Sequence, residues 1–207
     1  GFWHQRWAEN AIGFHLEEVN PFLVKCWSEL HISADSKVFV PMCGKSRDMT
    51  WLREQGHSVL GVEISDTACK AFFEESGVEP EIDNDGRYLS RSLDGIALLC
   101  GDFFALESSD LEGVRAVYDR AALIALPEEM RERYVERMLD ILPVGVNVLL
   151  ITLEFDSPSG PPFSVTEAEI RALYGSRFEV VKLCETDLMP IKAAMGRETV
   201  WRLTEKD

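Results

Sequence analysis

Residues 37–65 read KVFVPMCGKSRDMTWLREQGHSVLGVEIS, and this stretch decides the fold. The apolar run at 37–41 predicts a short buried strand, and residues 58–64 predict a second one. Between them, residues 46–55 predict a helix with Met49 and Leu52 on its apolar side. A strand, a helix and a strand in this order indicate two parallel strands joined by a crossover helix.

The same alternation continues toward the C-terminus. Further helices are predicted at 65–76, 127–142 and 166–174, and further strands at 96–100, 115–119, 146–155, 178–184 and 199–203. No helical pattern separates the last two strands, so one of them is expected to run antiparallel. The pattern therefore predicts an α/β fold with a Rossmann-like, mostly parallel seven-stranded sheet and helices on both faces. Ligands of such sheets bind at the carboxyl ends of the strands.

The length of 207 residues predicts one domain over 1–207. Within it, residues 1–35 form an N-terminal helical segment rich in aromatic residues, expected to act as a lid, and 2–30 is helical by pattern. Residues 79–94 are rich in turn formers and predict a surface insertion, for which a hairpin is one interpretation. Residues 156–163 predict a second surface insertion after the fifth strand, where it could cover a site.

Composition excludes several classes of protein. Asp and Glu number 36 against 21 Lys and Arg, for a formal charge of −15, and such a surface repels phosphate backbones. We therefore expect no nucleic-acid partner. No apolar run approaches the roughly 18 residues of a membrane span, so no membrane association is expected. The five cysteines form no CxxC pair, which disfavours a disulfide framework or a metal site and favours a reducing cytoplasm. We expect a cytoplasmic monomer.

The turn after the first strand lacks the known phosphate-binding patterns. Gly44 is its only glycine, so GxGxxG is absent, and GxxxxGK[ST] fails because Phe39 holds its first glycine position. Glu63 ends the second strand, where an acid can accept both hydroxyls of a ribose. The alternative interpretations are a simple strand-to-helix turn and an exposed strand-end carboxylate.

Two further strands end in candidate site residues. Asp102 and Phe103 follow the third strand, where they would lie beside an adenine; the alternative is that Asp102 caps the next turn. Asp119 and Arg120 end the fourth strand; the alternative is that they pair only with each other. A nucleoside site without a pyrophosphate cradle points to S-adenosylmethionine.

Several segments resemble the thiopurine S-methyltransferase family, especially its bacterial form. They are Phe2-Trp3, Arg6-Trp7, Phe14-His15, residues 41–45, residues 56–65, residues 119–123 and residues 160–163. The resemblance runs from Phe2 to about Glu205. It implies the class I S-adenosylmethionine-dependent methyltransferase fold, S-adenosyl-L-methionine as cofactor, and a small-molecule thiol as substrate.

The resemblance also implies cofactor-binding roles. Trp7 would close over S-adenosylmethionine, the backbone of Met42 would contact it, and Glu63 would hold the ribose. Asp102 and Phe103 would lie by the adenine. The family usually has Leu at the position of Met42, a mild departure.

For the acceptor side, the resemblance places Arg120 at the cofactor and near the substrate, and associates Phe14 with the substrate pocket. Arg120 would stabilise or orient a thiolate, and Asp119 would orient Arg120 or help to accept a proton, so these two are the catalytic candidates. For Trp3, Trp7 and Phe14 the alternative is packing of an N-terminal helix on the sheet.

The expected function is therefore transfer of a methyl group to the sulfur of thiopurines and related aromatic thiols. Selenium and tellurium species, whose methylation would be a detoxification, are further expected acceptors. One alternative is a methyltransferase of the same fold with another small-molecule acceptor. Others are an NAD-binding oxidoreductase, which the missing GxGxxG disfavours, and an interaction module that docks through the aromatic N-terminus.

Overall fold

The computed structural model describes residues 5–7, 9, 18–75, 77–157 and 159–206. Contacts between residues divide the chain into two compact units. Unit 1 comprises residues 1–25 and 33–106, and unit 2 comprises residues 26–32 and 107–207. Each unit contains part of the predicted alternation of strands and helices, and a single domain over the whole chain stays a prediction.

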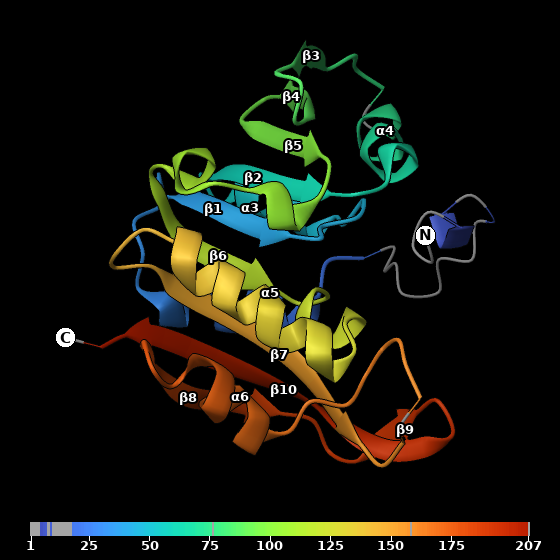
Figure 1. The fold of residues 1–207 in the computed structure, drawn as a ribbon, viewed down its shortest axis with the longest axis vertical. Coiled ribbons are helices and arrows are strands. Elements are labelled where there is room, and N and C mark those ends of the chain that lie inside the picture. Colours follow the sequence, from blue (N-terminus) through green and yellow to red (C-terminus); the bar gives the residue numbers. More distant parts are fainter. Residues whose placement is uncertain (1–4, 8, 10–17, 76, 158, 207) are drawn as a thin grey trace. The chain divides into compact units, whose positions relative to one another are not determined.

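The sheet of unit 1 contains three parallel strands and a hairpin. Its strand order is β3-β4-β5-β2-β1 (Figure 1). The bounds are β1 (Lys37–Pro41), β2 (Ser58–Glu63), β3 (Glu81–Asn84), β4 (Leu89–Leu93) and β5 (Ile96–Cys100). Strands β1, β2 and β5 run parallel, while β4 pairs antiparallel with both β3 and β5. The insertion predicted at 79–94 is thus a hairpin that extends the sheet.

Two helices pack on this sheet, α3 (Asp48–Glu54) and α4 (Asp66–Glu74). Ser65 caps α4, because its side chain accepts a hydrogen bond from the Ala68 N–H at 3.3 Å. Side chains pack closely on Gly61 in β2. A Cβ there would lie 2.6 Å from Leu98 Cδ2, 2.7 Å from Cys43 Sγ and 3.2 Å from Met49 Sδ of α3, so a larger residue would require these side chains to shift.

The N-terminal segment departs from the expected continuous helix over 2–30. Residues 5–7 are helical, residues 18–20 are not, and α2 (Pro21–Cys26) and the 3-10 turn η1 (Trp27–Leu30) follow. Proline disfavours the helical conformation in the residue before it, and the Asn20 side chain accepts the Phe22 N–H at 2.8 Å. The prediction of one helix is therefore wrong at this point, and Trp3 and Phe14 lie outside the described residues.

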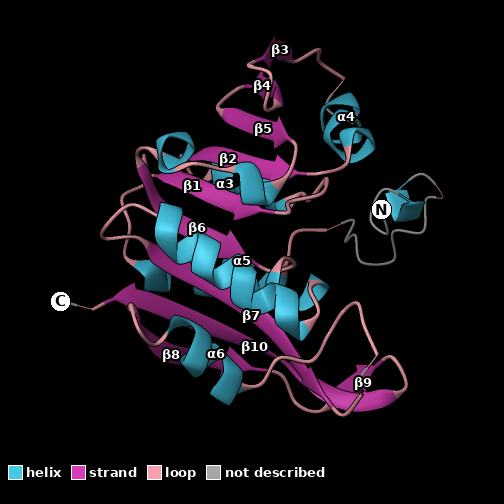
Figure 2. Ribbon diagram, in the orientation of Figure 1, coloured by secondary structure: helices cyan, strands magenta, loops and turns pink. Residues whose placement is uncertain are grey.

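The sheet of unit 2 has the strand order β6-β7-β10-β8, and β9 pairs with β10. Its bounds are β6 (Val114–Asp119), β7 (Asn147–Phe155), β8 (Phe178–Glu185), β9 (Met189–Ile191) and β10 (Ala194–Glu205). Strands β6 and β7 are parallel, and β10 is antiparallel to β7 and β8, as predicted for one of the last two strands. The seven predicted strands are all present, and β3, β4 and β9 are additional (Figure 2).

Helical elements cover both faces of this second sheet. Trp27 in η1 packs edge-on against Tyr118, with ring centroids 6.5 Å apart, whereas Tyr134 in the long helix α5 (Glu128–Ile141) bonds Asp119. Neighbouring residues of a strand point to opposite faces, so η1 and α5 lie on opposite sides of β6. The shorter helix α6 (Glu167–Tyr174) contacts β8 and α5.

Two structural findings concern the expectations about disulfides and membrane spans that were drawn from composition. All five cysteines are free thiols: Cys26, Cys43, Cys69, Cys100 and Cys184. Within the part of the chain that the structure describes, every helix falls short of the length and apolar content that membrane crossing requires.

Candidate active site

The carboxylate of Glu63 links two turns at the end of β2. The Gly44 N–H donates to its Oε2 at 2.9 Å, and the Ser65 N–H donates to its Oε1 at 2.8 Å. A carboxylate has about four acceptor positions, and the N–H groups of Gly44, Ser65 and Ile64 take up about three of them. Glu63 is only 6% exposed. The carboxylate therefore keeps limited acceptor capacity at the carboxyl end of β2, where the sequence predicts a ribose.

Burial also controls the charge of Glu63. Desolvation raises the pKa of this carboxyl above its usual value, and the N–H groups of Ser65, Gly44 and Ile64 partly oppose the increase. The backbone of both turns is therefore arranged to favour the ionised form, which is the form that accepts hydroxyl hydrogen bonds best.

The turn after β1 has two residues in the left-handed region, Met42 at φ 47° and Gly44 at φ 56°. Non-glycine residues held in this region occur often at functional sites. The Cys43 N–H between them donates to the Val62 carbonyl at 3.0 Å, which ties the turn to β2. Trp7 is buried over the turn, because a Cβ on Gly44 would lie 3.2 Å from its Cζ2. Unit 1 thus brings together Trp7, Met42 and Glu63.

The segment that follows β5 is also tied to Glu63. The Gly101 N–H donates to the backbone carbonyl of Glu63 at 2.9 Å. Asp102 caps the 3-10 turn η2 (Phe103–Ala105), since its Oδ1 accepts the Phe104 N–H at 2.9 Å. The capping interpretation of Asp102 is thus confirmed, and its side chain is exposed. The Phe103 ring is 3% exposed and presents little surface.

Ile64 is a candidate that the sequence interpretation missed. It directly follows Glu63, and its side chain is 43% exposed. A large apolar side chain beside a strand-end carboxylate offers a contact surface for a flat base. The signal in the sequence is that the apolar run of β2 continues one residue beyond the acid.

Asp119 and Arg120 lie in unit 2, at the end of β6. The buried Asp119 carboxylate accepts the Tyr134 hydroxyl at 2.7 Å and the N–H groups of Ala122 and Leu123 at 3.1 and 3.3 Å. Asp119 therefore does not pair only with Arg120. It fixes the chain that follows β6, while Arg120 is partly exposed beside it. Desolvation raises the pKa of Asp119 to about 6.

The loop after β7 contacts the same part of unit 2. The Phe163 N–H donates to the Ile124 carbonyl at 2.7 Å, within the 3-10 turn η4 (Leu123–Ala125). The Ser164 hydroxyl accepts the Phe155 N–H at 2.9 Å and closes the base of the loop. The insertion predicted at 156–163 is therefore held against the segment that carries Arg120. Phe14, the predicted acceptor contact, lies outside the described residues.

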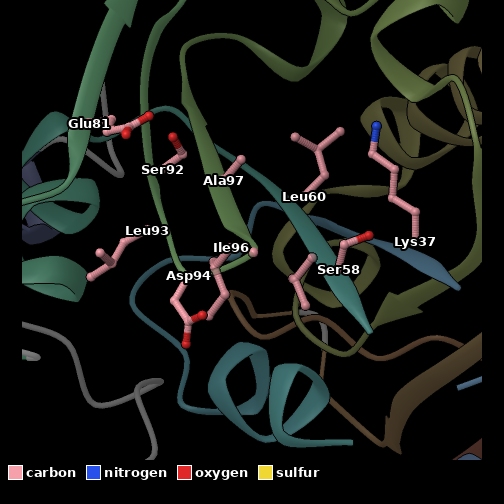
Figure 3. Close-up of a pocket in the computed structure, with 11 residues that line it drawn as sticks. Lys37, Ser58, Leu60, Glu81, Ser92, Leu93, Asp94, Ile96 and Ala97 are labelled. Atoms are coloured by element: carbon pink, nitrogen blue, oxygen red, sulfur yellow. The ribbon is translucent and has the colours of Figure 1, made fainter. Parts of the chain in front are cut away.

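A hollow of about 420 Å³ in unit 1 lies at the opposite ends of the strands (Figure 3). Lys37, Ser58 and Ile96, the first residues of β1, β2 and β5, line it together with Glu81 and Asp94. Glu63 is the last residue of β2, so this hollow is separate from the predicted site.

The raised pKa of Asp119 leads to a prediction about stability. Between about pH 4, where an unfolded Asp titrates, and about pH 6, the folded protein binds the extra proton. This group therefore makes the wild type less stable as the pH rises through that window. Asp119→Asn removes this titration. The unfolding free energy of the variant minus that of the wild type should therefore increase by about 3 kcal/mol between about pH 4 and about pH 7. Urea unfolding of both proteins at each pH measures this difference. Parallel curves of unfolding free energy against pH would contradict the raised pKa of Asp119.

Comparisons with known proteins identify the family of the chain. The family model for Thiopurine S-methyltransferase (TPMT) matches residues 1–206. A Thiopurine S-methyltransferase of Nitrosospira multiformis is 47% identical over 206 residues, covering 99% of this chain and 94% of that protein.

Two solved structures share the fold. One is the 1,6-didemethyltoxoflavin-N1-methyltransferase of Burkholderia thailandensis with bound 1,6-didemethyltoxoflavin and S-adenosylhomocysteine. It matches with a TM-score of 0.67 and 15% identity, and the match covers 100% of this chain and 86% of that one. The other is an S-adenosylmethionine-dependent methyltransferase of Anabaena variabilis, which matches with a TM-score of 0.69 and 16% identity over 99% of this chain and 93% of that one. The fold is that of the class I methyltransferases, and the match over nearly the whole length places the chain in the thiopurine S-methyltransferase family.

Proposed function

We propose that this protein transfers the methyl group of S-adenosylmethionine to the sulfur of thiopurines and related aromatic thiols. The observation that carries the proposal is the Glu63 carboxylate, which joins the turn after β1 to the turn after β2 at the strand end where a ribose is expected. Membership of the family, and the name of the relative from Nitrosospira multiformis, support the reaction and the acceptor class.

The residues of unit 1 fit S-adenosylmethionine, which supplies a methyl group activated on a positively charged sulfur. Glu63 accepts the ribose hydroxyls, and the exposed Ile64 contacts the base. The exposed Asp102 carboxylate lies on the adjacent segment, as expected for an adenine contact. The Met42 backbone and the Trp7 ring border the turn at Gly44. That turn has a single glycine and no phosphate cradle, which suits a cofactor without phosphates.

Arg120 acts on the acceptor in this proposal. Its guanidinium stabilises an anionic sulfur and orients it for attack, while Asp119 positions the segment through Tyr134 and two backbone N–H groups. The Asp119 carboxylate is buried and accepts three hydrogen bonds, so positioning is the role proposed for it. An aromatic thiol is largely ionised near neutral pH, so a strong base is not required. The lid role predicted for residues 1–35 and the covering role predicted for the loop 156–163 stay part of this proposal, because a methyl transfer of this kind gains from the exclusion of water.

The proposal extends to the setting of the protein. Five free thiols suit a reducing compartment, and we infer a cytoplasmic monomer built as one domain. Selenium and tellurium anions are proposed as further acceptors, because they are soft nucleophiles like a thiolate. The alternative is that the protein methylates another small-molecule acceptor. A screen of many acceptors would detect that activity.

Titration with S-adenosylhomocysteine and with NAD tests the cofactor. We expect S-adenosylhomocysteine to bind and to change tryptophan fluorescence, and NAD to leave both heat and fluorescence unchanged. Because Trp7 lies over the Gly44 turn, Trp7→Phe should remove most of the fluorescence change, whereas Trp51→Phe in α3 should keep it. Binding of NAD without binding of S-adenosylhomocysteine would overturn the proposal.

A further inference from the structure

The hairpin β3–β4 has no role in the site as described so far. It carries Tyr88, which is 2% exposed although it lies in a polar segment of the chain. Its hydroxyl donates to the Asp102 carbonyl at 2.9 Å. Its ring lies against Gly101, where a Cβ would be 2.6 Å from Tyr88 Cδ1. Tyr88 therefore touches two consecutive residues of the segment proposed to meet the adenine.

Polar contacts of the hairpin turn fix Tyr88 itself. The Asp85 Oδ1 accepts the N–H of Tyr88 at 2.7 Å and the N–H of Arg87 at 2.8 Å. The Arg87 guanidinium lies over the Tyr88 ring at 5.3 Å and donates to the Ala105 carbonyl at 3.2 Å. The turn thus holds both ends of residues 102–105.

The same hairpin also reaches the segment that follows β2. Arg91 of β4 is buried, and its Nη2 lies 2.7 Å from Oδ1 of Asp66, the first residue of α4. Asp66 comes three residues after Glu63. The insertion therefore contacts the chain after β2 and the chain after β5, the two segments between which an adenosine would lie.

We propose that Tyr88 is a positioning residue for cofactor binding: it holds Gly101 and Asp102 at the place where they receive the adenine. The inference rests on the proposed function. The Gly101 N–H bond to Glu63 and the turn of η2 also hold this segment. Loss of the Tyr88 hydroxyl removes one of the two hydrogen bonds that the Asp102 carbonyl accepts, so residues 101 and 102 are held less firmly and the cofactor must order them on binding.

Tyr88→Phe tests this with the loss of one oxygen atom. The ring remains, and the Asp102 carbonyl still accepts the Ala105 N–H at 3.1 Å, so the fold should persist. We expect the dissociation constant of S-adenosylhomocysteine to rise about 3- to 12-fold. The KM for S-adenosylmethionine should rise in parallel, whereas kcat and the KM for the thiol should stay at wild-type values, because the acceptor side is untouched.

Two further variants keep the test sharp. Ser90→Ala on β4 is the matched control, because its hydroxyl contacts only the Asp83 carbonyl of the same hairpin, at 3.4 Å, among the bonds described, and it should bind as the wild type does. Arg87→Gln removes the contact with Ala105 from an exposed position, and we expect about 2- to 5-fold weaker binding without loss of stability.

The possible outcomes separate the two proposals. If the wild type does not bind S-adenosylhomocysteine, the proposed function fails. If the wild type binds and Tyr88→Phe and Arg87→Gln bind equally well, the positioning role is wrong. A Tyr88→Phe protein whose melting temperature, kcat and thiol KM all worsen together would show a merely structural residue, which also overturns the inference.

Discussion

Replacing Glu63 by Gln should weaken the binding of S-adenosylhomocysteine about 10- to 150-fold, the expected cost of losing hydrogen bonds to a charged acceptor. The amide nitrogen of Gln cannot accept the N–H of Gly44 or Ser65, so one of the two turns also loses its tie. Calorimetry of the folded variant measures the effect. Glu75→Gln, which removes a carboxylate paired with Lys45 at the end of α4, is the matched control and should bind normally.

The pH dependence of binding gives the same residue a second test. Because burial raises the pKa of Glu63, protonation removes the acceptor at a higher pH than for an ordinary Glu. The affinity of the wild type should fall as the pH falls through that pKa, and the affinity of Glu63→Gln should lack this step. If Glu63→Gln binds as tightly as the wild type at neutral pH, the ribose assignment is wrong.

Replacing Arg120 by Ala should lower turnover of thiols about 30- to 1,000-fold, by analogy with the loss of one donor to a developing or full negative charge. Arg120→Lys keeps the charge but loses the planar fork, so it should retain more activity. S-adenosylhomocysteine affinity should change less than turnover. Arg115→Ala, an exposed position nearer the start of β6, is the control that should leave both unchanged.

The comparison of turnover with affinity decides the role of Arg120. Thiols of graded acidity should each be assayed with the wild type, Arg120→Ala and Arg120→Lys. An equal loss of cofactor affinity and turnover for every thiol would make Arg120 a cofactor ligand, and its role toward the acceptor would then be wrong.

The regular part of the fold could be predicted because its signals are local. The apolar runs of β1 and β5 gave strand bounds that match the structure at both ends, and the insertion at 79–94 is the expected hairpin. The interruption of the predicted helix at residues 18–20 was missed. The helical spacing of apolar residues was given more weight than Pro21, although proline disfavours the helical conformation in the residue before it. Strand β9 and the start of β10 were missed because Pro190 and Gly196 are poor strand formers. The antiparallel pairing of β9 with β10, with Pro190 opposite Met195 and Gly196 opposite Met189, holds both segments.

The candidate site could be predicted only as far as strand ends allow. The position of Glu63 follows from the end of a strand, and its hydrogen bonds to Gly44 and Ser65 follow from the two adjoining turns. The bond between Asp119 and Tyr134 joins a strand to a separate helix, so no local pattern reports it. Tyr88 was missed for the same reason: its contact with Asp102 depends on how β4 pairs with β5.

The central claim is methyl transfer to sulfur, and a product assay tests it most directly. The protein would be incubated with S-adenosylmethionine and either 6-mercaptopurine or its oxygen analogue hypoxanthine, and the products identified by mass spectrometry. We predict one S-methylated thiopurine for each S-adenosylhomocysteine formed, and no methylation of the oxygen analogue. Methylation of an oxygen or nitrogen acceptor while 6-mercaptopurine and other aromatic thiols remain unchanged would contradict the claim.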